Sequence, residues 1–172
     1  MNITLLDGGN GQEIYLRSNK PAHPLWSVKV MLDNPNIVTK VHEDFIKSGS
    51  KIICLNTYTA TYSRLKRDGK VEWFKKAHEI AISCAKKSID RNRLKFPNIQ
   101  ISGCLPPLVA SYKPETTRSY EECLDEYSKI VEIQEKNVDF FLAETMSTIL
   151  EAKSAINAAK YFNKKILVSF TL

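Results

Sequence analysis

Two acidic residues stand at the ends of apolar segments, where a carboxylate group is available for chemistry. Asp7 ends the segment 3–7, and Glu144 ends the segment 138–144. A buried carboxylate without a partner is costly, so each acid needs a cation or a hydrogen-bond donor. A bound ammonium group would meet that need, and so would a salt bridge or a loop cap inside the protein. Both interpretations are open at this point.

Glycines follow Asp7 directly. The string Gly8-Gly9-Asn10-Gly11 leaves its backbone amides free to approach an anionic ligand closely. Its spacing matches neither the dinucleotide-binding fingerprint nor the phosphate-binding P-loop. A tight turn without a ligand explains these glycines as well as a binding site does.

Polar residues also end the other apolar segments. Asn56-Thr57-Tyr58 ends the second, Gly103-Cys104 the third and Thr171 the last. In parallel β/α folds the loops after the strands place polar groups over the strand ends, and active sites lie there. We therefore expect function at this end of the predicted strands.

The segments between these ends alternate in character, as expected for a parallel sheet with crossover helices. The predicted strands are 3–7, 51–57, 99–104, 138–144 and 165–171, and their continuous hydrophobicity suits burial on both faces. Helices are predicted from Pro35 to before Gly49, over 72–94, from the capping box of Ser119 and Glu122 to the turn at Lys136, and from Ile149 to near Asn163. Residues 10–33 form a long excursion.

Two architectures fit this alternation: an open doubly wound sheet, and part of an eight-stranded barrel. The last predicted strand has no helix after it, which favours the barrel. At roughly 35 residues per unit, about three more units would complete one. We predict a single domain over residues 1–172, a partial (β/α)8 TIM barrel of about five parallel strands, truncated after the fifth.

The composition narrows the class of protein. The 172 residues carry 25 Lys and Arg against 19 Asp and Glu, a net charge of +6, but the lysines fall mostly on predicted helix faces and ends, without interleaved aromatics. No apolar run approaches the about 18 residues of a membrane span, and a strand pattern begins by Ile3, leaving no room for a signal core. We expect a cytoplasmic protein that binds neither nucleic acid nor membrane.

The strings at the predicted strand ends together resemble the homocysteine S-methyltransferase family. They are LLDGGNG, the pair Leu25-Trp26, HEDFIKSGSKIICLNTYTAT (42–61), SGCLPPLVASYKPE (102–115) and DFFLAETM (139–146). The resemblance implies a zinc-dependent methyl transfer from a sulfonium or ammonium donor to the thiol of homocysteine. The substrate-binding residues that it implies are Asp7, Gly8, Gly9, Thr57, Tyr58, Glu144 and Trp26.

The resemblance also implies a role for each of these residues. Asp7, the backbone of Gly8-Gly9 and Glu144 would hold the amino-acid head group, with Glu144 as the ammonium partner, and the strand-two end would line the same pocket. Trp26 would offer its aromatic face to a cationic donor, although plain packing is an alternative. S-methylmethionine or S-adenosylmethionine is the expected donor, because the betaine branch has more aromatics where Asn56 and Thr59 stand here.

Zinc is expected for the family, bound by cysteine motifs after the sixth and eighth strands, and neither motif is in these 172 residues. Cys54, Cys84, Cys104 and Cys123 form no C-x-x-C pair and no cluster with histidine, so we expect reduced thiols and assign no metal ligand. The first hypothesis is therefore a methyltransferase fragment that holds half of the substrate pocket and is inactive alone.

Two alternatives belong to other classes. One is a non-catalytic partial barrel that pairs its open strand edges with a second copy or with another chain. The other is a barrel lyase or aldolase, which is disfavoured because no lysine stands at a strand end to form a Schiff base.

Overall fold

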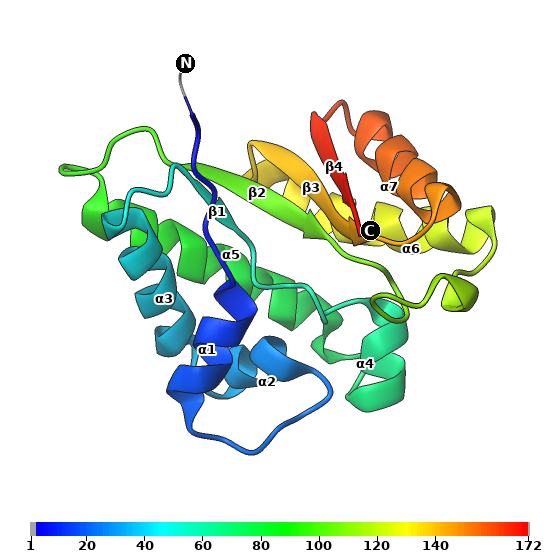
Figure 1. Cartoon of the computed structure of the whole chain (residues 1–172), viewed down its shortest axis with the longest axis horizontal. Helices are drawn as coiled ribbons and strands as arrows, with labels where there is room; N and C mark the ends of the chain where they lie inside the picture. The colour runs from blue at the N-terminus through cyan, green and yellow to red at the C-terminus, as the bar shows by residue number, and fades with distance from the viewer. Residues whose placement is uncertain (1–2, 172) are drawn as a thin grey trace.

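The computed structural model describes residues 3–171 and contains one parallel sheet (Figure 1). Its four strands, β1 (Ile52–Cys54), β2 (Gln100–Leu105), β3 (Phe140–Met146) and β4 (Ile166–Phe170), lie side by side in chain order. Every neighbouring pair is parallel, so each connection is a helical crossover. This is the alternation that the sequence predicts.

Seven α-helices accompany the sheet in the described residues. They are α1 (Asn10–Ser18), α2 (Trp26–Asp33), α3 (Pro35–Lys47), α4 (Tyr62–Asp68), α5 (Trp73–Asn92), α6 (Tyr120–Gln134) and α7 (Ile149–Tyr161). Two short 3₁₀ helices are also present. Pro114–Thr116 lies between β2 and α6, and Glu135–Asn137 lies between α6 and β3. Helices α3, α5, α6 and α7 confirm the four predicted crossovers, and neighbours in this series pack on one another.

Helices α1, α2 and α4 were not predicted. Each has nine residues or fewer, too short for a clear apolar period. They are held in place by their contacts with other helices. The capping box was predicted correctly: Ser119 Oγ accepts from the Glu122 amide at 3.3 Å, and Glu122 Oε2 accepts from the Ser119 amide at 3.1 Å.

The prediction of a strand over residues 3–7 is wrong. These residues form only an isolated parallel bridge between Leu6 and Ile52, although the Lys51 amide donates to the Leu5 carbonyl at 2.8 Å and the Asp7 amide to the Ile52 carbonyl at 2.9 Å. This segment pairs on one side only, and Ile3 is 85% exposed. Too few hydrogen bonds remain to define a strand, yet Asp7 still lies beside β1.

The second predicted strand is also shorter than expected. Strand β1 ends at Cys54 instead of Thr57, because the chain turns and the Ala60 amide donates to the Thr57 carbonyl at 2.9 Å. Asn56, Thr57 and Tyr58 therefore belong to a loop over the strand end. This loop begins one wall of the pocket described below.

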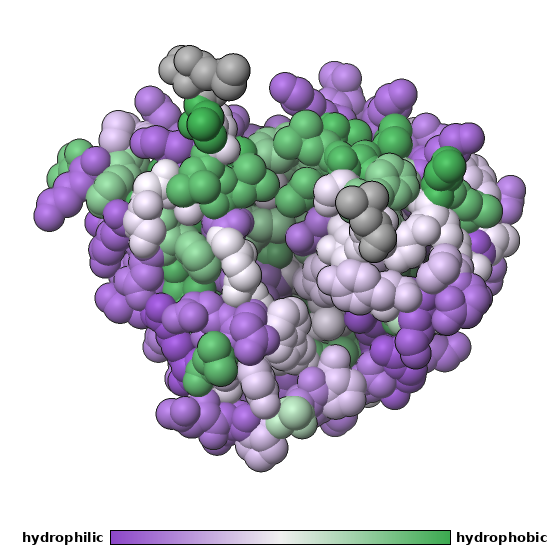
Figure 2. All heavy atoms as spheres, in the orientation of Figure 1, coloured by the Kyte–Doolittle hydropathy of each residue, from purple (hydrophilic) through white to green (hydrophobic). Residues whose placement is uncertain are grey.

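The sheet is buried unevenly. Ile53, Leu105 and Phe141 are fully enclosed or nearly so, whereas β4 leaves Leu167 43% and Phe170 51% exposed. Burial of the last strand on both faces was predicted and is wrong, because no described element lies beyond β4. Figure 2 shows hydrophobic residues gathered where Figure 1 draws the N-terminal segment and the sheet. None of the described helices has the length and apolar character required to cross a membrane.

Two histidines are enclosed between the helices and the sheet. His78 on α5 lies 3.2 Å from the Ala60 carbonyl through Nε2 and 2.9 Å from Gln134 Nε2 through Nδ1. His42 on α3 is fully buried, and neither ring nitrogen has a hydrogen-bond partner within residues 3–171. Burial lowers the pKa of each imidazole to about 4, so both are neutral in the folded state at pH 7.

These histidines predict acid destabilisation. The unfolded chain takes up protons near pH 6.5 and the folded chain only near pH 4, so stability is fully present above 6.5 and is lost as the pH falls toward 4. The loss is on the order of 2 kcal/mol per histidine at about pH 5. Urea unfolding across this range should show it, and His42→Leu should remove about half of the effect. An unchanged slope in that variant would contradict the assignment.

Candidate active site

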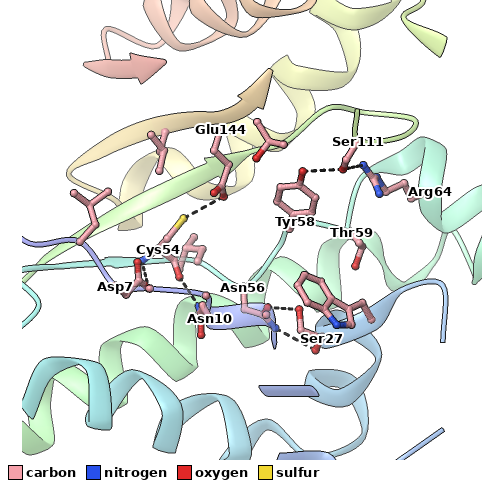
Figure 3. Close-up of a pocket in the computed structure, with 18 of the residues that line it drawn as sticks. Asp7, Asn10, Ser27, Cys54, Asn56, Tyr58, Thr59, Arg64, Ser111 and Glu144 are labelled. Carbon is pink, nitrogen blue, oxygen red and sulfur yellow. Dashed lines mark hydrogen bonds between the residues drawn. The ribbon is translucent and has the colours of Figure 1, made fainter. Parts of the chain in front are cut away.

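The strand ends and the loops after them surround a pocket of about 520 Å³, a size that suits a small molecule (Figure 3). Of the residues that the sequence assigned to substrate, six line it: Asp7, Gly8, Gly9, Trp26, Tyr58 and Glu144. The seventh, Thr57, is not among the lining residues. It is buried behind the loop, where its Oγ1 accepts from Gln134 Nε2 at 3.2 Å.

One end of the pocket is acidic. Asp7 Oδ2 accepts a hydrogen bond from the Cys54 amide at 2.9 Å, and Glu144 Oε1 accepts from Cys104 Sγ at 3.1 Å. Neither carboxylate forms a salt bridge with any residue in 3–171. The internal salt bridge considered from the sequence is therefore not found in the described part of the chain.

The two carboxyl groups are hard to ionise in this setting. Burial raises the pKa of Asp7 to about 7, which the hydrogen bond from Cys54 partly offsets and the nearby Glu144 reinforces. Burial likewise raises the pKa of Glu144, against hydrogen bonds from both cysteines. A cation placed between them would favour the ionised forms of both.

The opposite end of the pocket is basic. Arg64 on α4 is 7% exposed, and its Nη2 donates to the Pro107 carbonyl at 2.9 Å and to Ser111 Oγ at 3.2 Å. Tyr58 Oη lies 2.8 Å from the same hydroxyl, and the guanidinium lies 5.5 Å from the centre of the Tyr58 ring. Arg64 has no carboxylate partner among the salt bridges of the described chain. The pocket thus carries acidic side chains at one end and a guanidinium group at the other.

The sequence did not point to Arg64 or Ser111. Arg64 lies on helix α4, which was not predicted, and Ser111 lies in the long loop after β2; both are several residues beyond the end of the preceding strand. The only feature of the sequence that could have indicated these two residues is their position after predicted strands, where polar groups gather at one edge of a parallel sheet.

Helix α2 holds the loop after β1 in place. Ser27 Oγ donates to Asn56 Oδ1 at 2.7 Å, and Asn56 Nδ2 donates back to the Ser27 carbonyl at 3.2 Å. Thr59 Oγ1 donates to the Leu25 carbonyl at 2.6 Å. These hydrogen bonds join the loop to residues 10–33, for which no helix or strand was predicted. This segment therefore forms one side of the pocket.

Trp26 begins α2 in a backbone conformation that is unusual for a bulky residue, with φ of 45°. Its ring packs directly over Gly11 of α1, where an added Cβ would lie 2.6 Å from the indole. The glycine therefore leaves room for the ring at the edge of the pocket.

Two cysteines also converge on the acidic end, which the sequence did not predict. Cys54 Sγ, Cys104 Sγ and a Glu144 carboxylate oxygen all lie within 4.8 Å of one another. A partial signal was present, since Cys54 stands inside the second predicted strand and Cys104 at the end of the third, but their separation of 50 positions along the chain hid it.

A family model for homocysteine S-methyltransferase matches residues 4–172. The chain belongs to the homocysteine S-methyltransferase family. This confirms the resemblance and makes the chain a methyltransferase by family, and it disfavours the lyase alternative. The family match includes both carboxylates and the glycines between the first strand segment and α1.

Similar proteins agree with this membership. Homocysteine S-methyltransferase YbgG of Bacillus subtilis (strain 168) is 23% identical over 174 residues, which cover 93% of this chain and 55% of YbgG. Betaine–homocysteine S-methyltransferase 1 of Rattus norvegicus is 25% identical over 178 residues, 99% of this chain and 41% of the rat protein. The chain spans about half the length of these relatives.

Solved structures confirm the fold. The oxidized form of the homocysteine methyltransferase MmuM from Escherichia coli has a TM-score of 0.88 at 24% identity, over 99% of this chain and 62% of MmuM. The metallated form has a TM-score of 0.86 at 22% identity, over 100% of this chain and 64% of MmuM. The predicted partial TIM barrel is therefore confirmed, with the first strand reduced to a bridge.

The contact between Gly11 and Trp26 yields a prediction. In a Trp73→Phe background, Gly11→Ala should push the Trp26 indole out of its position and shift its fluorescence emission toward that of a solvent-exposed ring. The matched control is Gly9→Ala, whose Cβ would meet nothing closer than Gln12 at 4.0 Å. Equal emission from the two alanine variants would show that the packing over Gly11 does not position the ring.

Proposed function

We propose that this chain binds homocysteine as part of an enzyme that transfers a methyl group from a sulfonium donor, S-methylmethionine or S-adenosylmethionine, to the homocysteine thiol, giving methionine. The observation that carries the proposal is the pair of partly buried carboxylates, Asp7 and Glu144, which line a pocket and lack a cationic partner within residues 3–171. A substrate ammonium group supplies the missing charge. Family membership supports homocysteine as that substrate.

The glycines complete the head-group site. The amides of Gly8 and Gly9 make no hydrogen bond to backbone or side chain in the described structure, and they lie at the N-terminal end of α1. A substrate carboxylate placed there receives these donors and the favourable end of the helix dipole. Asp7 and Glu144 then bind the ammonium group on the same substrate.

The remaining assigned residues shape the pocket. Tyr58 lines it directly, and Thr57 supports the loop from behind through Gln134. Trp26 faces the pocket and offers its ring to the positive sulfonium of the donor, an interaction that favours a methylated cation over its neutral product.

The reaction is a displacement at carbon. The homocysteine sulfur attacks the donor methyl group, a new carbon–sulfur bond forms, and the old bond breaks so that its electron pair leaves with the neutral thioether product. Zinc, when bound, keeps the attacking sulfur as a thiolate at neutral pH. The cysteine motifs that the resemblance assigns to zinc are not in this sequence, so we expect the 172 residues alone to bind homocysteine without turnover.

The four cysteines are free thiols, and the substrate must be reduced to react. Free cysteines and a reduced substrate thiol both fit a reducing compartment, and we include a cytoplasmic location in the proposal.

Asp7→Asn and Glu144→Gln test the head-group site. Each variant keeps the shape of the side chain but removes its negative charge, so homocysteine should bind roughly tenfold to a hundredfold more weakly, as expected for the loss of a charged hydrogen-bond partner. Isothermal titration calorimetry measures the affinity. The control is Glu79→Gln, which neutralises an exposed acid on α5.

Thermal unfolding of the variants distinguishes a loss of homocysteine binding from a loss of folding. Neither carboxylate loses a salt bridge on substitution, and the neutral side chains avoid the cost of desolvating a charge, so both variants should unfold at the same temperature as the unmodified chain or higher. Homocysteine affinity equal to that of the Glu79→Gln control would sink the proposed site. Methyl transfer by the 172-residue chain alone would instead refute its predicted lack of turnover and leave the site standing.

A second candidate function is association through the open sheet edges, with a second copy or a complementing chain. It is favoured by the exposed apolar side chains at those edges, Ile3 and Leu5 on one side and Leu167 and Phe170 on the other. Analytical ultracentrifugation should show self-association that Phe170→Lys weakens. The control is Tyr161→Lys, which changes an exposed aromatic on a helix, α7, and leaves the strand edge itself unchanged. A monomer at every concentration would contradict self-association.

A further inference from the structure

Three neighbouring strands place one potential metal ligand each on the same face of the sheet. Cys54 on β1 pairs with Ser102 on β2, and Cys104 lies two residues beyond that partner. Cys104 in turn pairs with Leu142 on β3, and Glu144 lies two residues beyond it. Side chains two residues apart point to the same face of a strand. The two-residue stagger therefore brings all three side chains to one point.

From this arrangement we propose that Cys54, Cys104 and Glu144 form a binding site for a thiophilic divalent cation, with Zn²⁺ as the first candidate. The three ligand atoms lie within 4.8 Å of one another. Glu144 Oε1 is 3.1 Å from Cys104 Sγ and 3.8 Å from Cys54 Sγ. In a tetrahedral zinc site, with zinc about 2.3 Å from sulfur and about 2.1 Å from oxygen, adjacent ligand atoms lie roughly 3.5 Å apart. Small side-chain rotations suffice to reach that geometry.

The chemistry of the ligands selects the class of metal. Two thiolates and one carboxylate suit zinc or a similar soft cation and disfavour magnesium and calcium, which prefer oxygen ligands. No lysine or arginine pairs with Glu144 in the described chain, so the positive charge of a metal would compensate negative charge that has no protein cation beside it. Both cysteines are buried, which protects a bound ion from bulk water.

Three ligands leave one coordination position free. Cys54 and Glu144 both line the pocket, so the free position faces the cavity (Figure 3) and can accept water. The two cysteines contact the same carboxylate oxygen, Oε1, and Oε2 accepts no hydrogen bond from residues 3–171. Oε2 remains available to an ammonium group beside Asp7, so the metal site is compatible with the proposed head-group site.

The site is specific to two of the four cysteines. Cys84 Sγ donates to the Pro35 carbonyl at 3.3 Å, and Cys123 Sγ lies 3.8 Å from the Arg118 carbonyl. Neither belongs to a group of potential ligands in the described structure. These cysteines are internal controls of the same residue type and similar burial. The proposed ligands also differ from the late cysteine motifs that the family resemblance assigns to zinc.

Cobalt titration tests the site directly. The whole chain is reduced with a phosphine, freed of metal by chelation and dialysis, and titrated with Co²⁺ and then Zn²⁺. We expect one equivalent of Co²⁺ to bind with a thiolate-to-cobalt charge-transfer absorption, and Zn²⁺ to displace it. Cys54→Ser and Cys104→Ser should each weaken binding by more than about tenfold, the loss seen even for groups that only orient ligands.

The controls make every outcome decisive. Cys84→Ser and Cys123→Ser should bind Co²⁺ like the unmodified chain, and Glu144→Gln, which preserves the side-chain shape, should keep the charge-transfer absorption but bind more weakly. Circular dichroism checks that each variant is folded; if a serine variant is not, Glu144→Gln decides. No thiolate absorption in the reduced chain, or equal binding after loss of the proposed ligands, would overturn the site. Because the readout needs no homocysteine, its failure is distinct from failure of the proposed function.

Discussion

The register of the parallel strand pairs determines where the chemistry of this protein lies. Strands β1, β2 and β3 are each offset so that the functional residue of one lies two positions beyond the partner of the preceding one. A shift of one residue in either pairing would turn a cysteine or Glu144 toward the helices and away from the pocket. Helices α3, α6 and α7 contact these strands from outside the pocket, so the apolar core and the polar pocket depend on the same alignment.

The pocket concentrates groups that are costly to bury. Asp7, Glu144 and Arg64 all lie in its walls without a salt bridge to a described residue, and each charge is therefore open to a ligand. The surrounding loops are less free to move. Asn56 and Thr59 are tied to α2, and Gln134 joins Thr57, His78 and the Cys104 amide in one buried network. These hydrogen bonds hold the loop after β1 against α2 and α6, and this loop forms part of the pocket wall.

Membership in the homocysteine S-methyltransferase family and the charge pattern of the pocket are independent observations, and both support the ligand proposed for this pocket. The family relates the chain to enzymes whose names include homocysteine, and the pocket presents the charges that an amino acid requires. The cysteine cluster adds a property that belongs to this chain's own residues. Glu144 connects the two, since one of its oxygens contacts both thiols and the other faces the pocket.

The sequence by itself determined the alternation of strands and crossover helices, the capping box at Ser119, and the placement of Asp7 and Glu144 toward the carboxyl ends of apolar segments. These features depend on local periodicity and on groups close together in the chain, which a sequence displays directly. Only the tertiary structure decided that 3–7 forms one bridge, that α2 and α4 build the pocket walls, that Thr57 lies behind the pocket, and that Cys54 and Cys104 meet. Each of these features depends on hydrogen bonds and packing between residues that are distant in sequence. Strand register and burial determine such contacts, and the local sequence pattern does not.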